Sequence, residues 1–459
     1  MLQRLLNAFK SAPAHVSARP SDGAPDRSVD VAHGLVLGGQ NSAALSVLER
    51  RLAAAPDDAD ALALKGWILV DQGASDEART ALARVLQLKP EHVEALNTLG
   101  ALEADDPDPQ RSMHWFRAAL KSDSQNLAAL YNLAQKLFFV GEYAEGFRLL
   151  RARHQLHFKR DNPLEPLPIW RGENLQGKRV FVWCDWGGLG DHLMFIRFVG
   201  RLREHANPAR VIVGAQPTCM RLFVGMPGID EVAQPGAMPQ AEVHCPLLDL
   251  PHHLGVTTAS VEADAASFMP YLRADDALTQ LWSERIGRLC PPDRALRVGL
   301  VWGNDQRTGA AAHERARQAK AVPPQALAGL AASGARFFGL QLGATPDELA
   351  ATGLDVIDLA PDVKDFADTA AIIAALDLVI SADTSVAHLA GAMGKPVLLM
   401  LGEAGGMFWP RTGAQTPWYP SMEIARQESG AWRVPVNQAS LMIERAASHH
   451  PIRGSLKRT

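Results

Sequence analysis

The chain has 459 residues, of which 47 % are hydrophobic and 21 % charged, a composition typical of soluble protein with roughly two to four domains. The formal net charge of −4 gives no argument for a nucleic-acid-binding surface or for strong attraction to a membrane. No apolar run reaches the ~18 residues of a transmembrane helix, so none is predicted. The cysteines lack CxxC pairing, which favours reduced thiols in a cytoplasmic protein; they are Cys184, Cys219, Cys245 and Cys290.

A helical repeat follows a flexible leader that we predict over residues 1–27, which are rich in Ala, Pro, Ser and Asp. Gly66 and Gly100 lie 34 residues apart, and Gly39 and Gly73 occupy turn positions at the same interval. A large apolar residue keeps this period at Leu48, Leu82, Phe116 and Leu150. The pattern resembles tetratricopeptide repeats, each a pair of antiparallel helices, and we predict about four units over residues 28–156. A helical bundle without a superhelix would not need this shared register.

A proline-stiffened connector over residues 157–177 leads to an α/β domain predicted at residues 178–290. The strand RVFVWC is followed directly by the glycine-rich turn GGLGD, residues 187–191, and by an apolar-periodic helix predicted over His192 to Leu202. Such a turn lets the backbone approach a bound group closely. It lacks the third glycine of a dinucleotide fingerprint and the lysine of a phosphate-binding ATPase loop.

A second α/β domain is predicted over residues 291–450, with a basic tail at 451–459. Its first strand ends near Trp302 and Asn304, where side chains would face a ligand bound at the carboxyl edge of the sheet. Gln341 ends the next strand and is a candidate contact for the base or ribose of a nucleotide.

The stretch from residue 377 to 401 reads as a buried strand, a polar turn, a short helix and another buried strand. Its turn carries Asp383, Thr384 and Ser385, and His388 follows on the first helical turn. The free N–H groups and the positive end of a helix favour a phosphate here, and the hydroxyl groups and His388 add hydrogen-bond donors. The alternative is that Asp383 or Thr384 only caps the helix.

The motif DTSVAHLAGAMGKPV resembles the nucleotide-sugar motif of the GT-B glycosyltransferases related to bacterial heptosyltransferases, glycosyltransferase family 9. The later segment TPWYPSMEIARQ resembles the stretch that follows it in members bearing tetratricopeptide repeats. The resemblance implies a tetratricopeptide solenoid followed by two Rossmann-like domains facing each other across a cleft. It also implies transfer of a sugar from a nucleotide donor to a hydroxyl group with inversion at the anomeric carbon.

The resemblance assigns roles to particular residues. Asp191 matches the aspartate of the GLGD turn that the family places at the reaction centre, so it is the candidate general base, with Gly188 and Gly190 shaping its turn. Its alternative role is to cap the following helix. Lys320 stands where relatives tend to carry Arg, and it would contact phosphate as a point charge. Fixed donors would replace a metal ion, so no cofactor is expected beyond the nucleotide sugar.

The tetratricopeptide repeats predict a protein acceptor, because such arrays usually bind protein segments. Two other functions stay open. One is a non-catalytic scaffold whose transferase domains are degenerate, and the other is a nucleotide-sugar epimerase of the same two-domain architecture, which would need no acceptor.

Overall fold

The computed structural model divides into two compact units, Met1–Asn162 and Pro163–Thr459, and each is considered by itself. The described residues are 27–104, 106, 108–157, 167–184, 187–234, 239–289, 295–303, 320–403 and 405–448. The predicted tail, Asn304, nearly all of the predicted leader and nearly half of the connector lie outside these residues. Among the described residues, no helix combines the length and the apolar character needed to cross a membrane.

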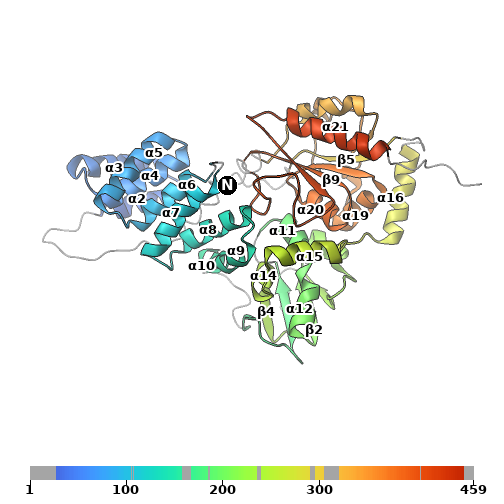
Figure 1. Cartoon of the computed structure of the whole chain (residues 1–459), viewed down its shortest axis with the longest axis horizontal. Helices are drawn as coiled ribbons and strands as arrows, with labels where there is room; N and C mark the ends of the chain where they lie inside the picture. Colours follow the sequence, from blue (N-terminus) through green and yellow to red (C-terminus); the bar gives the residue numbers. More distant parts are fainter. Residues whose placement is uncertain are drawn as a thin grey trace, which may run out of the picture. The chain divides into compact units, whose positions relative to one another are not determined.

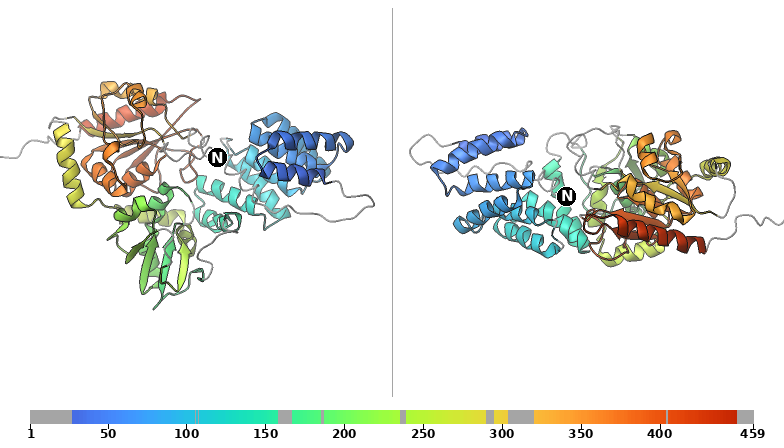
Figure 2. Two further views of the ribbon diagram at one scale, coloured as in Figure 1. Left: turned by 180° about the vertical axis from the view of Figure 1, so that it is seen from behind. Right: turned by 90° about the horizontal axis from the view of Figure 1, so that it is seen from above.

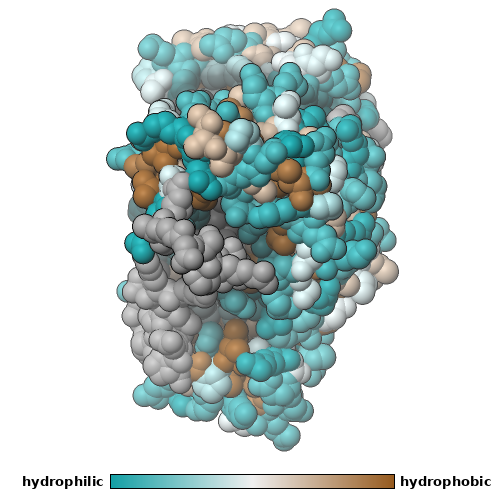
Figure 3. Space-filling model, turned by 90° about the vertical axis from the view of Figure 1, so that its left-hand side faces the viewer, coloured by the Kyte–Doolittle hydropathy of each residue, from teal (hydrophilic) through white to brown (hydrophobic). Residues whose placement is uncertain are grey.

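The first unit is a succession of helices that pack against their neighbours along the chain (Figure 1). The helices are α2 (Ser28–Leu37), α3 (Asn41–Ala54), α4 (Ala59–Gln72), α5 (Ser75–Leu88), α6 (Val93–Leu102), α7 (Pro109–Ser122), α8 (Leu127–Phe139), α9 (Tyr143–Leu150) and α10 (Arg153–His157). On the face shown in Figure 3, hydrophilic residues predominate and hydrophobic residues form small separate groups.

The repeat period places small and large residues against each other. A Cβ atom on Gly66 would approach the Leu82 side chain to 2.8 Å, and Gly100 lies against Phe116 in the same way one period later. Gly73 ends α4 with a φ of 82°, a left-handed conformation that favours glycine. The large apolar positions of the period are fully buried. The sequence prediction of paired helices with a 34-residue period is therefore confirmed.

The second unit begins with a four-stranded parallel sheet of order β3-β2-β1-β4. Its strands are β1 (Arg179–Trp183), β2 (Arg210–Gly214), β3 (Glu231–Ala233) and β4 (Val243–Pro246). One prediction is wrong here: the helix expected over His192 to Leu202 is two helices, α11 (Leu189–Phe195) and α12 (Phe198–Ala206). The helix is interrupted by a turn at Ile196 and Arg197, and the guanidinium of Arg197 bonds back to the Met194 carbonyl oxygen at 2.9 Å. The remaining helices of this domain are η1 (Pro217–Cys219), α13 (Met220–Phe223), η2 (Leu247–Asp249), α14 (Leu250–His253) and α15 (Thr258–Phe268).

A six-stranded parallel sheet follows, of order β10-β9-β8-β5-β6-β7. The strands are β5 (Arg297–Val301), β6 (Arg336–Gly339), β7 (Val356–Asp358), β8 (Leu378–Ala382), β9 (Val397–Leu401) and β10 (Met422–Arg426). The chain starts in the middle at β5, builds outward to β7 and then returns to β8 on the other side. This is the doubly wound order of a nucleotide-binding fold, with its topological switch point between β5 and β8.

Helices cover both faces of the six-stranded sheet (Figures 1 and 2). They are α16 (Asp276–Leu289), η4 (Pro324–Ser333), α18 (Pro346–Ala351), η5 (Ala360–Asp362), α19 (Phe366–Ala375), α20 (Ser385–Ala392) and α21 (Arg433–Ser448). Leu327 and Leu330 of η4 pack with Val436 and Ala439 of α21 in the core on one face. The architecture is the predicted one of helical repeats followed by two parallel α/β domains.

Candidate active site

Two strand-to-helix turns occupy the switch points of the two sheets. The GGLGD turn follows β1, which lies between β2 and β4, and the Asp383–Thr384 turn follows β8, which pairs with β5. Ligands of open α/β sheets bind at the carboxyl ends of the strands at such points. The two turns meet, since a Cβ atom on Gly190 would come within 2.6 Å of Cδ2 of His388. A side chain at Gly190 would therefore require His388 or one of the two turns to shift.

Asp383 is buried in the turn after β8 and holds two side chains from elsewhere in the domain. Its Oδ2 forms an ion pair with the ammonium of Lys320, and its Oδ1 accepts a hydrogen bond of 3.0 Å from Nε1 of Trp409. Burial acts to raise the pKa of this carboxyl group. The charge of Lys320, the neighbouring His388 and the two hydrogen bonds outweigh burial and lower the pKa from 3.8 to about 2. Asp383 is therefore ionised at neutral pH and fixes the position of Lys320.

The hydroxyl groups of the same turn are not used to cap α20. Thr384 is the residue before the helix, yet its side chain makes no capping bond. Its Oγ1 instead lies 3.0 Å from the Oγ of Ser381. The N–H groups of the first turn of α20 consequently have no side-chain cap, and Ser385 is half-buried beside them. Asp383 and Thr384 thus do not cap α20, which was the alternative role considered from sequence.

His388 is buried among aromatic rings. Its Nδ1 lies 3.0 Å from the hydroxyl of Tyr419, and its ring stacks on Trp409 with centroids 4.9 Å apart. Burial lowers the pKa of the imidazole from 6.5 to about 4, although Asp383 and Asp191 oppose this shift. The ring is therefore neutral at physiological pH.

The helix that carries His388 lies directly on the Tyr419 ring. A Cβ atom on Gly391 would approach that ring to 2.7 Å, so only glycine allows the contact. The sequence gives no local sign of this pairing, because the two residues belong to different elements.

Asp191 stands at the start of α11, where its Oδ2 accepts a hydrogen bond of 2.6 Å from the N–H of Gly188. The aspartate therefore does cap its helix. It is half-buried, and among the described residues none is in hydrogen-bond contact with its other oxygen. Its charge acts on the imidazole of His388. One carboxylate oxygen is thus fixed by the turn, and the other is left for a ligand.

Among the described residues, the structure does not bring the remaining predicted donor-site residues into hydrogen-bond contact with Asp383, His388 or Asp191. Trp302 is buried in the apolar core of the six-stranded sheet, with only 3 % of its surface exposed. Gln341 is also buried, and its Oε1 accepts a hydrogen bond of 2.8 Å from the N–H of Gly303, so it shapes the end of β5. Asn304 lies outside the described residues.

Sequence reasoning missed the residues that support His388. Arg197 donates from Nη1 to the carbonyl oxygen of Trp418 at 2.9 Å and from Nη2 to the hydroxyl of Tyr271 at 3.0 Å. Its guanidinium also lies over the rings of Tyr271 and Tyr419, at 4.4 and 5.0 Å from the centroids. These residues are far apart along the chain, and only Trp418 and Tyr419 fall in a segment that the sequence singled out.

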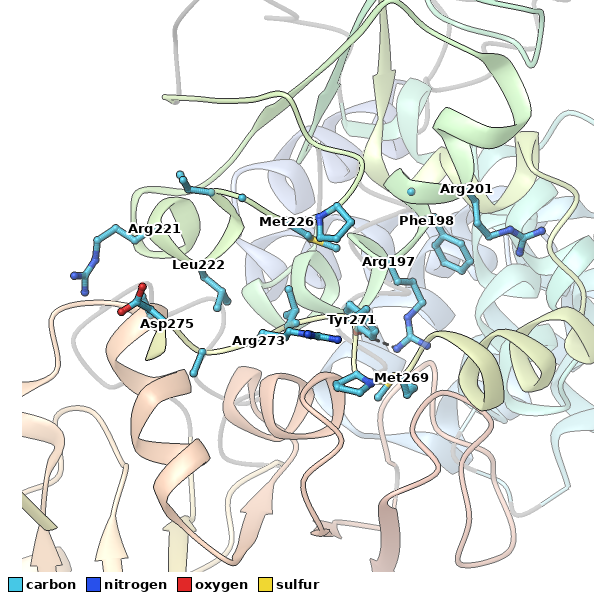
Figure 4. A pocket seen from close by; sticks show the side chains of 18 of the residues that line it. Arg197, Phe198, Arg201, Arg221, Leu222, Met226, Met269, Tyr271, Arg273 and Asp275 are labelled. Carbon is cyan, nitrogen blue, oxygen red and sulfur yellow. Dashed lines mark hydrogen bonds between the residues drawn. The ribbon is translucent and has the colours of Figure 1, made fainter. Parts of the chain in front are cut away.

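A cavity of about 780 Å³ lies beside this cluster, among α12, α13 and the segment from residue 269 to 275 (Figure 4). Arg197 and Tyr271 line it, whereas none of the predicted site residues does. The candidate site and this cavity are therefore separate features. No group of three or more His, Cys, Asp or Glu suited to a metal ion occurs in the described part of the chain.

Family comparisons agree with the two kinds of architecture. The tetratricopeptide repeat model matches residues 32–91 and 64–126. The model of glycosyltransferase family 9 (heptosyltransferase) matches residues 343–435, which include the Asp383 turn and the Tyr419 segment.

Known proteins of similar sequence or fold share low sequence identity with this chain. Protein FlbA of Caulobacter vibrioides is 27 % identical over 424 residues, covering 86 % of this chain and 68 % of that protein. A glycosyl transferase family 9 structure from Veillonella parvula has a TM-score of 0.42 and 13 % identity, covering 61 % of this chain and 98 % of that one. An O-GlcNAc transferase mutant of Thermobaculum terrenum has a TM-score of 0.32 and 16 % identity, covering 92 % and 91 %. The chain thus joins tetratricopeptide repeats to a glycosyltransferase family 9 domain.

Proposed function

We propose that this chain is a cytoplasmic, inverting, metal-independent glycosyltransferase that moves a sugar from a nucleotide-sugar donor to a hydroxyl group of a protein. The observation that carries the proposal is the meeting of the two switch-point turns, where Gly190 lies against His388. A carboxylate with one open oxygen and a helix end with uncapped N–H groups are thereby brought close together between the two α/β domains.

Asp191 is the proposed general base. Its open carboxylate oxygen would take the proton of the acceptor hydroxyl group while the hydroxyl oxygen of the acceptor attacks the anomeric carbon. The bond between this carbon and the diphosphate oxygen breaks on the opposite face of the sugar, which inverts the configuration. The electron pair leaves with the nucleoside diphosphate.

The charge that develops on the leaving diphosphate needs fixed donors. The uncapped N–H groups of α20, the hydroxyl of Ser385 and the ammonium of Lys320 are the proposed ones. Lys320 is held by Asp383 and remains about one-third exposed, so it can face a ligand. These donors would serve in place of a divalent cation.

Calorimetry tests the metal-independent version. ADP, GDP and UDP are titrated separately into the full chain, with and without EDTA. We expect one of them to bind equally well in both conditions. Binding that EDTA abolishes would overturn metal independence, and the absence of binding by all three would count against the proposed donor site.

The protein acceptor is proposed from the repeats, whose arrays present extended surfaces to peptide segments. A captured polypeptide would be held at a high effective concentration near the cleft. Candidate acceptor proteins co-expressed with the full chain are analysed by intact mass for added sugar. Removal of residues 1–162 should spare hydrolysis of the donor and sharply reduce transfer; equal transfer by the truncated chain would assign the repeats another role.

A further inference from the structure

The cavity beside Arg197 lies at the junction of the two α/β domains. Its walls come from α12 and α13 of the first domain, from the connecting segment at residues 269–275, and from Ala367 of α19 in the second domain (Figure 4). Its volume of about 780 Å³ is within the ~300–1,000 Å³ of ordinary small-molecule sites, which occur preferentially at domain junctions. The size and the position of this cavity therefore suit a small ligand.

Apolar side chains form much of the cavity wall. Phe198 belongs to α12, Leu222 to α13 and Leu272 to the connecting segment. Val224 also lines the cavity, yet 70 % of its surface is exposed, so an apolar group that covers it would be stabilised by its burial. Met226 is half-buried, and its flexible thioether side chain can adapt to the shape of a ligand. The body of a ligand that fits these walls is apolar.

Two arginines of the cavity have no carboxylate partner among the described residues. Arg197 hydrogen-bonds to carbonyl oxygens and to the hydroxyl of Tyr271, none of which carries a negative charge. Arg273 is exposed and makes no hydrogen bond or ion pair within the described part of the chain. Its side chain extends toward Tyr271 (Figure 4). An anionic group beside Tyr271 would therefore find two guanidinium donors.

The other charged side chains of the cavity already have partners or lie in water. Arg201 pairs with Asp264 at 2.7 Å, and Arg221 pairs at 2.6 Å with the aspartate that caps α19. Asp275 accepts a hydrogen bond from an N–H group at the start of α16 and lies at the same end of the cavity as Arg221, away from Arg197 (Figure 4). Glu204 of α12 is exposed, where water screens its charge. A ligand thus meets mainly the positive charge of the two guanidinium groups.

We propose that this cavity binds a small organic anion with an apolar body, of the class of alkyl carboxylates and alkyl phosphates, as an effector of the nucleotide site. The head group accepts hydrogen bonds from Arg197 and Arg273, and the apolar chain lies against Leu222 and Val224. The effector role rests on the proposed function, whereas the binding itself does not.

Arg197 connects the cavity with the candidate active site. Its Nη1 donates to the Trp418 carbonyl oxygen at 2.9 Å, and its guanidinium lies 5.0 Å from the centroid of the Tyr419 ring. The Tyr419 hydroxyl in turn lies 3.0 Å from Nδ1 of His388, on the helix whose start is the proposed diphosphate site.

The walls of the cavity also come from both α/β domains. A ligand bound there favours the arrangement of the domains in which Gly190 lies against His388. A nucleotide at the start of α20 lies at the same meeting point of the two turns. The two ligands therefore favour one arrangement and should strengthen each other's binding.

Calorimetry on the full chain tests the site with small probes. Octanoate and octyl phosphate should bind, and the tighter of the two identifies the head group. Octan-1-ol lacks the charge, and acetate and inorganic phosphate lack the chain, so each of these should bind about 10-fold more weakly or not at all. Equal binding of octan-1-ol would overturn recognition of an anion. Failure of both octyl anions to bind would overturn the site.

Two exposed residues locate the bound anion. Arg273→Gln should weaken its binding about 10-fold, the worth of a hydrogen bond between charged groups. Val224→Asp should also weaken it, because a carboxylate replaces the apolar surface under the chain. Arg288→Gln changes an exposed arginine of α16 that does not line the cavity, and it should leave the affinity unchanged. All three variants should fold normally, as thermal unfolding will check, and parental affinity in Arg273→Gln would overturn the proposal.

The effector role is tested by titrating the nucleoside diphosphate with and without saturating octanoate. Octanoate should tighten nucleotide binding about 5-fold, at the lower end of common coupling between sites, and Arg273→Gln should abolish this gain at the same octanoate concentration. Unchanged nucleotide affinity would overturn the effector role. If no nucleotide binds the parent protein, the proposed function fails, while the octanoate titrations still decide whether the cavity binds an anion.

Discussion

The two turns that meet in the cleft are built in opposite ways. In the GGLGD turn, Asp191 is half-buried, bonded through one oxygen only, and followed by a helix that bends at Arg197. In the turn after β8, Asp383 is buried and both of its oxygens are occupied. Each aspartate follows a strand at the switch point of its sheet, but only Asp191 has a carboxylate oxygen without a hydrogen bond among the described residues.

This difference suits Asp191 to proton transfer and Asp383 to holding its neighbours in position. A carboxylate that exchanges protons with a substrate needs an open oxygen and contact with solvent or ligand. One whose oxygens are both used can only hold its neighbours in place. Four substitutions test this distinction, and their expected effects decrease from Asp191 to Ser385.

Asp191→Asn should lower sugar transfer by ~10²–10⁴-fold, the usual worth of a positioned acid–base group. The amide oxygen still accepts the hydrogen bond from the Gly188 N–H, so folding and donor affinity should be unchanged. Steady-state rates, thermal unfolding and nucleotide calorimetry check the three parts. Activity within threefold of the parent would reduce Asp191 to a helix cap.

His388→Gln should change how stability depends on pH. The folded-state pKa of about 4 lies below the ordinary 6.5, so the native protein binds fewer protons than the unfolded chain between these values. The parent should therefore lose about 3 kcal/mol of unfolding free energy as pH falls from 6.5 to 4. Denaturation at several pH values should show this slope in the parent and in His114→Gln, an exposed control, but not in His388→Gln.

Asp383→Asn should destabilise the protein at pH 7 by about 2 kcal/mol, because it removes a carboxyl group whose pKa is lowered to about 2. This contribution is present above the ordinary pKa of 3.8 and is lost as pH falls toward 2. The two unfolding curves should thus converge in acid. The exposed Asp347→Asn provides the control, and a variant as stable as the parent at pH 7 would show that the ion pair with Lys320 contributes nothing.

Ser385→Ala should weaken binding of the nucleoside diphosphate by about 1 kcal/mol, the worth of one hydrogen bond to a charged group at a partly exposed site. Stability should not change, since the Ser385 hydroxyl has no hydrogen-bond partner among the described residues. Calorimetry with the nucleotide that binds the parent measures the effect. Equal affinity would remove the hydroxyl from the donor site and leave the backbone N–H groups alone.

Much of the fold could be predicted from sequence because its signals are local. The 34-residue period and the left-handed glycines define the repeats, and buried runs such as Leu378 to Ile380 define strands. The break at Arg197 could not be predicted in this way. Arg197 bonds there to Trp418 and Tyr271, which are distant in sequence, so these contacts leave no local signal.

In the candidate site too, some residues have a local sequence signal and others do not. Asp383 and His388 were found because they lie in one short motif, and Asp191 because it follows a glycine-rich turn. Their partners Trp409 and Tyr419 come from a later loop. Tyr419 lies in the segment TPWYPSMEIARQ, but its pairing with His388 has no local signal, and nothing local distinguishes Trp409 from an ordinary core aromatic. Trp302 shows the opposite error, because a residue at a strand end can as readily face the core as the ligand.

The bonds of Arg197 also bear on how the cleft opens. The guanidinium of Arg197, at the junction of α11 and α12 in the first α/β domain, donates to a backbone carbonyl of the second domain. It also lies against aromatic rings from the connecting segment and the second domain. Separation of the domains on this side has to break these contacts together, since they share one rigid planar group. We therefore expect opening to be a step between two populations rather than a gradual drift. Single-molecule distances between the two α/β domains would then show two peaks.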